Sequence, residues 1–295
     1  MKHLILFILF SVIVSCAGPA QEVVPFIAAP GTNGTIIAYN GKQFIFHAPN
    51  FTIITNIRIV DPMIYTPIEG GKPVFAAIVD YKAMTFDFSG SSIQWTKVAE
   101  GVRLFMDVRY LYVQSGNKVQ FLKDYAADGY FTMPDKIVTG QYWAGKFLAG
   151  FEGNLLTVYE FADTPDSVKS FSAKLPEAVI FAVHPNAPYL YFIDKNDRIF
   201  SYHLYSKESK FIDAPPFKVM RIEILAADNS LMVYGADKVF IYRNCDKQNI
   251  RGMQIDPLDI AVNPMLDEYY YLYPDRIEVW SIPEQIKVKT IEIGK

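Results

Sequence analysis

Short apolar stretches alternate with polar turns along almost the whole chain. The segment from Tyr189 to Asp213 shows this pattern clearly: Tyr189–Ile193 is aromatic and branched, residues 194–197 are polar, and Arg198–Leu204 is again apolar and alternating. A second polar turn and a third apolar stretch follow. Aromatic and β-branched residues bounded by Asp and Asn are typical of β-hairpins. The segment therefore predicts three antiparallel strands joined by short turns.

The same hairpin recurs at a regular interval. Its second strand begins at residues 41, 81, 117, 154, 197, 237 and 275, so the period is about 40 residues. A continuous apolar run precedes each hairpin, as expected of an inner strand buried on both faces. These runs are Val23–Ala28, Ile57–Asp61, Val102–Asp107, Ile137–Gln141, Val179–Val183, Ile222–Ala226 and Leu258–Val262. Outer strands are expected at Phe51–Thr55, Ile93–Val98, Tyr130–Met133, Val168–Ala173, Lys210–Asp213, Ile250–Gln254 and Ile286–Ile293.

A period near 40 residues with about four short strands per unit is typical of a β-propeller. Seven such units occupy residues 23–295. The pattern therefore predicts an all-β protein with one domain, a seven-bladed β-propeller of four-stranded antiparallel blades. A pair of two-sheet β-sandwiches is the alternative, although a sandwich gives no reason for so regular a period.

The last unit resembles a WD-repeat hairpin followed by its outer strand, with the sequence DRIEVWSIPEQIKVKTIEI from Asp275. The phrases Ala182–Asn186 and Ala261–Pro264 resemble the turn after the inner strand of such a repeat. The chain is thus similar to the WD-repeat-like seven-bladed β-propeller superfamily across residues 23–295. The Gly-His dipeptide of true WD repeats is absent, and only Trp280 occupies the terminal Trp position. The buried hydrogen-bond network of that family is therefore not expected here.

The N-terminal residues predict a targeting signal. A short basic segment precedes the apolar run from Leu4 to Val14, which is too short to span a bilayer and matches the core of a signal peptide. The run ends in Ile-Val-Ser before Cys16, which resembles the bacterial lipobox. The resemblance implies a signal peptide at residues 1–15 and a lipid anchor on Cys16. Cleavage after Ala17, with plain secretion, is the alternative.

A lipid anchor on Cys16 implies a place in the cell envelope, on the outer membrane or on the outer face of the cytoplasmic membrane. Two or more acyl chains anchor stably where one does not. Residues 16–22 would form a short tether, because the six residues from Ala17 to Glu22 reach only about 20 Å when extended. The propeller is therefore expected to lie close to the membrane.

Composition narrows the range of partners. The chain is 51% apolar and 20% charged, which is typical of an ordered protein with a large core. A net charge of −3 leaves no basic excess for a phosphate backbone, so nucleic acid is not an expected partner. The two cysteines cannot form a disulfide framework, and Cys245 is expected to be a small buried hydrophobe. We expect a monomer.

Motifs that carry chemistry are scarce. His47, His184 and His203 do not stand at metal-ligand spacing, and His184 and His203 are expected to lie at the surface or to cap turns. No serine nucleophile elbow, dinucleotide fingerprint or phosphate loop occurs. Neither a metal nor a cofactor is expected.

Two groups of residues are candidates for binding. The basic residues Arg58, Arg103, Lys136 and Arg221 stand at or near the start of inner strands. Those starts gather at one mouth of a propeller's channel, so the side chains are expected to form an anion-binding collar, unless they are unrelated solvated charges. Tyr142 and Trp143 are placed in a loop of the fourth unit. Loop aromatics are common binding anchors, although packing against a neighbouring blade explains them equally well.

Two functions from different classes fit these observations. The first is a non-enzymatic, membrane-tethered module that presents one face to an envelope protein or a surface glycan. The second is a propeller hydrolase or lactonase-type enzyme, with Asp61, Asp107 and Asp259 around the channel. Fold alone does not decide between them. Three acids and one His converging in the channel would favour the enzyme, whereas an apolar channel with isolated polar groups would favour the module.

Overall fold

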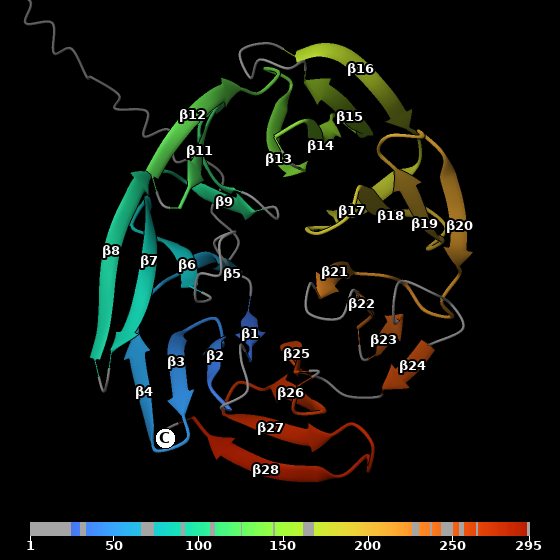
Figure 1. Cartoon of the computed structure of the whole chain (residues 1–295). Coiled ribbons are helices and arrows are strands. Elements are labelled where there is room, and N and C mark those ends of the chain that lie inside the picture. Colours follow the sequence, from blue (N-terminus) through green and yellow to red (C-terminus); the bar gives the residue numbers. More distant parts are fainter. Residues whose placement is uncertain are drawn as a thin grey trace, which may run out of the picture.

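The computed structural model describes residues 25–29, 34–65, 74–89, 92–106, 110–124, 126–143, 145–161, 168–225, 230–236, 238–242, 250–253, 257–263 and 265–293. Within these ranges the regular structure is entirely β. Seven four-stranded antiparallel sheets stand in a ring around a central axis (Figure 1). The predicted seven-bladed propeller is confirmed, and the sandwich alternative is wrong.

The blades are numbered here in chain order, and each is built from four consecutive strands. Blade 1 contains β1 (Phe26–Ala28), β2 (Ile36–Tyr39), β3 (Gln43–Ala48) and β4 (Phe51–Asn56). Blade 2 contains β5 (Val60–Tyr65), β6 (Val74–Val79), β7 (Lys82–Ser89) and β8 (Ser92–Glu100). Blade 3 contains β9 (Arg103–Met106), β10 (Leu111–Ser115), β11 (Lys118–Lys123) and β12 (Ala126–Thr132). Blade 4 contains β13 (Ile137–Trp143), β14 (Phe147–Glu152), β15 (Leu155–Phe161) and β16 (Val168–Leu175). Blade 5 contains β17 (Ala178–Val183), β18 (Tyr189–Asp194), β19 (Ile199–His203) and β20 (Ser209–Asp213). Blade 6 contains β21 (Arg221–Leu225), β22 (Ser230–Tyr234), β23 (Val239–Tyr242) and β24 (Ile250–Met253). Blade 7 contains β25 (Asp259–Asn263), β26 (Glu268–Leu272), β27 (Arg276–Ser281) and β28 (Lys287–Glu292).

In every blade the first strand is innermost and the fourth is outermost (Figure 1). Four antiparallel strands return the chain to the side from which it started, so each inner strand begins at the same mouth of the channel. Residues at the start of the inner strands are therefore neighbours around this mouth, although they lie about 40 residues apart in sequence.

The inner strand β5 differs from its prediction. The apolar pattern predicts an end at Asp61, yet β5 continues to Tyr65. The pairing of β5 with β6 shifts between Val60 and Met63, and Asp61 adopts a positive φ of 48°. A β-bulge places this Asp-Pro dipeptide where Pro62 costs no ladder hydrogen bond, which allows the strand to continue beyond it.

Apolar side chains pack at the junctions between blades. At the junction of blades 2 and 3, Ala76 and Ile78 pack with Leu111 and Val113. A cluster of this kind joins each neighbouring pair of blades around the ring. A single blade would expose these faces to water, so its stability depends on its neighbours.

Among the described strands, none is exchanged between the first and last blades of the ring. Blade 1 consists of β1–β4 and blade 7 of β25–β28. The Ile27 backbone N–H donates to Asp259 Oδ2 at 2.8 Å, and Asn263 Nδ2 donates to the Ala29 carbonyl at 3.1 Å. Ile27 and Ala38 also pack with Tyr270. Closure therefore depends on side chains rather than on a shared sheet.

Several predicted features lie outside the described residues. These are the signal peptide, Cys16 and the tether, together with Asp107 and Cys245. Within the described ranges there is no helix long and apolar enough to cross a membrane.

Candidate functional site

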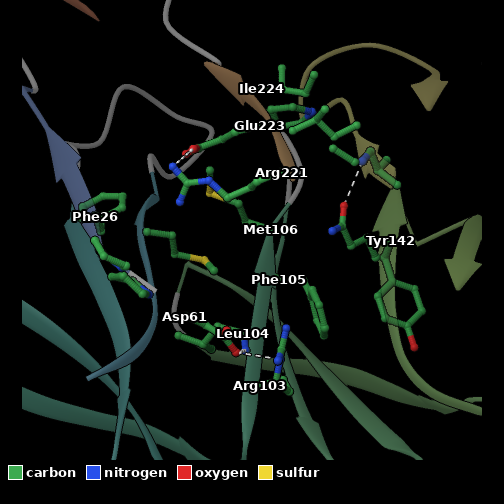
Figure 2. A pocket seen from close by; sticks show the side chains of 18 residues that line it. Phe26, Asp61, Arg103, Leu104, Phe105, Met106, Tyr142, Arg221, Glu223 and Ile224 are labelled. Atoms are coloured by element: carbon green, nitrogen blue, oxygen red, sulfur yellow. Dashed lines mark hydrogen bonds and ion pairs between the residues drawn. The ribbon is translucent and has the colours of Figure 1, made fainter. Parts of the chain in front are cut away.

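A cavity of about 420 Å³ lies at the centre of the ring, between the inner strands of blades 1 to 6 (Figure 2). Its walls are largely apolar, with Phe26, Met106 and Ile222 among the residues that line it. Its described lining includes four charged residues, Asp61, Arg103, Arg221 and Glu223. A concave, mostly apolar site of this volume with a few polar groups is typical of ligand-binding pockets.

One side of the cavity carries an ion pair between blades 2 and 3. The bulge in β5 brings Asp61 Oδ2 to 3.0 Å from the backbone nitrogen of Leu104 and 3.0 Å from Arg103 Nε. The backbone N–H is aligned to donate, whereas the buried Nε of Arg103 has no hydrogen-bond partner despite its short distance from the carboxylate. Asp61 therefore joins the two blades through the backbone and balances the charge of Arg103 without a well-aligned hydrogen bond.

Another side carries a larger cluster on blades 6 and 7. Arg221, the first residue of β21, lies with Nη2 3.2 Å from Asp259 Oδ1 and 3.8 Å from Glu223 Oε2. Its guanidinium lies over the Tyr234 ring at 4.0 Å, and the Tyr234 hydroxyl donates to Asp259 Oδ1 at 3.2 Å. Asp259 also accepts the Ile27 N–H, so it contacts groups from three blades.

The cluster holds two carboxylates beside one guanidinium. Burial and the neighbouring Glu223 raise the pKa of Asp259 well above its ordinary range. Burial also raises the pKa of Glu223, although Arg221 opposes the shift. Two carboxylates that are close together, one of them fully buried, do not both ionise easily. The cluster therefore favours retaining a proton.

At the other ion pair the balance is simpler. Burial raises the pKa of Asp61, while Arg103 and the Leu104 N–H oppose the shift. One carboxylate faces one guanidinium there, so no second carboxylate adds to the effect.

The structure brings together two of the four basic residues of the predicted collar. Arg103 and Arg221 both line the cavity, with side chains 33% and 30% exposed. Lys136 does not line it: its side chain is 74% exposed and its Nζ contacts Glu152 Oε1 at 2.9 Å. Arg58 lies between β4 and β5 and is not in the lining. A ring of four converging cations is therefore not formed.

Tyr142 and Trp143 are not in a loop, because they are the last two residues of β13. Tyr142 lines the cavity, yet its ring stacks on Tyr112 at 5.3 Å in the cluster between blades 3 and 4. Trp143 meets the ring of Tyr205, from blade 5, edge to face at 5.5 Å. The alternative interpretation, packing between neighbouring blades, accounts for both residues.

Each histidine has a local contact. His184 Nδ1 accepts the Asn186 N–H and His203 Nδ1 accepts the Ser206 N–H, both at 3.0 Å, so both imidazoles cap turns. His47 is buried between blades 1 and 7. None of the three is in the cavity lining, and no group of three His, Cys, Asp or Glu residues suited to a metal occurs among the residues that the structure describes.

Two polar residues of the lining were not predicted. Gln141 Oε1 accepts the Val183 N–H at 2.8 Å and joins blade 4 to blade 5. Glu223 stands two residues after Arg221, and this spacing puts both side chains on one face of a strand. The i, i+2 spacing is the only available signal for Glu223, since its approach to Asp259 depends on how blade 7 packs on blade 6.

No protein-family model matches the chain, and no curated protein sequence matches it. Among solved structures the fold is similar to PorZ, an essential bacterial surface component of the type-IX secretion system of Porphyromonas gingivalis (TM-score 0.62, 10% identity). That match covers 93% of this chain but 39% of PorZ, so the chain spans about two fifths of the length of PorZ.

Two further similarities come from other settings. A variant of Kluyveromyces lactis Hsv2, in which a Gly-Ser linker replaces one loop, gives a TM-score of 0.55 at 9% identity, covering 80% of this chain and 82% of Hsv2. A chain of the mitotic checkpoint complex gives 0.52 at 10% identity, covering 92% of this chain and 88% of the other. Identities this low show a shared propeller fold and nothing finer. Similarity to WD-repeat proteins in particular stays a prediction.

Proposed function

We propose that this propeller is a non-enzymatic interaction module, tethered to a membrane of the cell envelope through Cys16, that binds another envelope protein at the channel mouth where the inner strands begin. The observation that carries the proposal is the cavity along the channel, whose lining runs from the starts of β1, β9 and β21 to the ends of β13 and β17. It combines apolar walls with the arginines of β9 and β21, held on a closed ring of rigid strands. Such rigid frames with accessible channel mouths are suited to binding.

The state of the carboxylates supports binding rather than hydrolysis. Asp61 and Asp259 each accept a backbone N–H from the next blade and each contact an arginine. Groups engaged in this way hold blades together, and a hydrolase would need one of them available to a water molecule. The described lining holds no histidine that would serve as a base beside them.

The place in the envelope rests on the sequence and on one comparison. The lipobox-like residues before Cys16 support lipidation, and PorZ, which shares the fold, is itself a bacterial surface component. Pro25, just before β1, lines the cavity. The chain that leads from Cys16 therefore reaches the ring at the same mouth, nine residues later, within about 30 Å of the lipid.

The tether is tested with Cys16→Ser in the full chain. We expect the wild-type protein in the membrane fraction after metabolic labelling with a palmitate analogue, and the variant unlabelled and released from the membrane. Labelling that persists in the variant, or an unlabelled wild-type protein, would contradict the tether.

Partner binding is tested by cross-linking in intact envelopes with Arg103→Gln and Arg221→Gln. We expect one protein cross-linked to the wild type to be lost from both variants. Lys210→Glu, on the exposed outer strand β20, is the control and should retain it. A cross-link that survives both arginine changes would contradict the mouth as the binding surface, and one that survives protease but not glycosidase would indicate a glycan instead.

A further inference from the structure

The charged groups that line the cavity differ in how they can adjust to a ligand. A carboxylate loses its charge by taking up a proton, and burial raises the pKa of both Asp61 and Glu223 in that direction. A guanidinium stays charged at any physiological pH and only donates hydrogen bonds. The charge of the cavity can therefore change only toward positive, which favours a ligand with a negative charge.

Both arginines keep donor capacity. The two carboxylate contacts of Arg221 are made by Nη2 alone, and Arg103 meets Asp61 only at Nε. Among the described residues nothing accepts a hydrogen bond from the Nη groups of Arg103. A guanidinium has five N–H donors in a planar fork that matches a carboxylate. With about a third of each side chain exposed, these donors are accessible from the cavity.

The contacts of Arg221 differ in strength. Asp259 lies 3.2 Å away and is fixed by the Ile27 N–H and the Tyr234 hydroxyl at 3.2 Å. Glu223 lies 3.8 Å from Arg221 and 3.5 Å from the same hydroxyl, and its side chain is 35% exposed. Figure 2 shows Glu223 beside Arg221. Glu223 is thus the more weakly held and the more easily displaced of the two acids.

We propose that the cavity binds a carboxylate group carried on an apolar body, with Arg221 as the main anchor and Arg103 as a second donor. The incoming carboxylate takes the place of Glu223 beside Arg221. Glu223 then takes up one proton from solvent. The negative charge of the carboxylate and the positive charge of this proton therefore enter the cavity together. Phe26, Met106 and Ile222 contact the apolar body. The groups that set the proton balance around Glu223 are Arg221, Asp259 and Tyr234, with Asp61 and Arg103 elsewhere in the lining.

This inference rests on the proposed function in taking the cavity as the contact surface, and it names the chemistry of the contact. The carboxylate has two possible sources, a small free acid or the carboxyl terminus of a partner chain. Both present the same group to Arg221, so the shared chemistry is tested first and the source afterwards.

The test is calorimetric titration of the full chain in detergent with 3-phenylpropanoate, with the matched amide 3-phenylpropanamide and the matched amine 3-phenylpropylamine as controls. We expect only the acid to bind, with an affinity that rises as the pH falls from about 8 to about 6, by at most about tenfold per pH unit for one coupled proton. Titrations in buffers of different ionisation enthalpy should show proton uptake. Equal binding of the amide or amine, or no binding of the acid, would overturn the proposal.

Variants separate the roles of the two arginines and Glu223. Arg221→Gln should weaken acid binding by about tenfold to a hundredfold, the scale of a charge-assisted bidentate contact. Glu223→Gln should bind more tightly at neutral pH and lose the pH dependence. Unchanged affinity in Arg221→Gln, or an unchanged pH profile in Glu223→Gln, would overturn the proposal. If Arg221→Gln does not fold, the proposal is decided by the other two variants. Unchanged affinity in Arg103→Gln, or an unchanged pH profile in Glu223→Gln, would then overturn it.

Arg276→Gln is the matched control. Arg276 lies over the Tyr273 ring at 4.1 Å and pairs with Glu278, as Arg221 does with Tyr234 and its acids, but it is not in the cavity lining. Its replacement should leave acid binding unchanged, and a loss equal to that in Arg221→Gln would count against the cavity.

A peptide ending in Phe then identifies the source. If the peptide with a free carboxyl terminus binds more tightly than 3-phenylpropanoate, the carboxylate belongs to the chain end of a partner protein. If that peptide binds more weakly, the ligand is a small acid. If the same peptide with an amidated terminus binds as tightly as the free-carboxyl peptide, the carboxylate assignment is overturned. If the acid binds but no cross-linked partner depends on the arginines, the interaction function fails and the binding site stands.

Discussion

Asp61 and Asp259 perform the same structural task at two junctions of the ring, in different electrostatic surroundings. Each accepts the backbone N–H of the next inner strand, from Leu104 and from Ile27 respectively. Asp61 contacts an arginine of the following blade, whereas Asp259 contacts Arg221 of the preceding blade. The comparison shows that one device can join two blades or three, depending on the side from which the arginine comes.

The second difference between Asp61 and Asp259 is what raises the pKa of each carboxyl. Burial raises the pKa of Asp61, which one guanidinium balances, whereas burial and the neighbouring Glu223 together raise the pKa of Asp259, which shares its guanidinium with Glu223. Both inter-blade contacts therefore depend on pH, and the contact at blade 7 has a second carboxylate as an additional cause. Three experiments sharpen this comparison.

The largest difference is expected between Asp259→Ala and Asp61→Ala. Asp259 is buried and accepts hydrogen bonds from three donors, so its loss should lower the free energy of unfolding by about 3–5 kcal/mol. Asp61→Ala should cost about 2 kcal/mol, because it loses one backbone donor and a partly exposed ion pair. Urea unfolding measures both, and equal costs would show that the number of blades contacted does not matter.

A smaller effect is expected from Glu223→Gln. A carboxyl whose pKa is raised in the folded state binds more protons there than in the unfolded chain, so wild-type stability falls as pH rises from about 4.5 through the folded pKa. The variant should be more stable than the wild type at neutral pH, by about 1 kcal/mol, because the amide removes a charge that burial disfavours and that also raises the pKa of Asp259.

The measurement is urea unfolding across a pH series, in which the variant should show the flatter profile. Glu268→Gln, an acid of blade 7 outside the cavity lining, is a control that should keep the wild-type profile. If Glu223→Gln is less stable than the wild type at neutral pH, the ionised Glu223 is needed by Arg221 and the shared-proton description of the cluster is wrong.

The smallest effect is expected from Lys289→Gln at the closing junction. His47 Nε2 lies 3.3 Å from Lys289 Nζ, and burial together with this lysine lowers the pKa of His47. The lowered pKa means that stability is lost as pH falls below about 6.5, opposite in sign to the carboxylate pair. The variant should raise the His47 pKa, seen by NMR titration of the ring protons, and reduce the acid loss by less than about 1 kcal/mol.

Much of the fold follows from local pattern. The alternation of apolar and polar residues, repeated at about 40-residue spacing, is a property of each unit by itself, so inner and outer strands are predicted to within a few residues. The bulge in β5 is the exception. Asp-Pro is typical of a strand end, and only the positive φ of Asp61 lets pairing resume at Met63.

The site is predicted less well, because it depends on which strands meet around the ring. The starts of the inner strands identify Arg103 and Arg221 correctly as cavity residues. The same rule includes Lys136, which immediately precedes β13 and turns to Glu152 of its own blade instead. Tyr142 and Trp143 are misplaced because their strand runs to its last aromatic residue. The closeness of Glu223 to Asp259 follows from the packing of blade 7 on blade 6, which no local pattern indicates.

The uninterrupted order of strands in each blade also matters while the chain folds. Every wedge has all four of its strands within its own forty or so residues, so neighbouring wedges can form and dock without the rest of the ring. The junction between the first and last wedges is different, since Ile27 and Asp259 are separated by 232 positions. The amino-terminal wedge therefore keeps one apolar face uncovered until the carboxyl-terminal wedge docks on it, and this last docking step is where aggregation of the folding protein would begin.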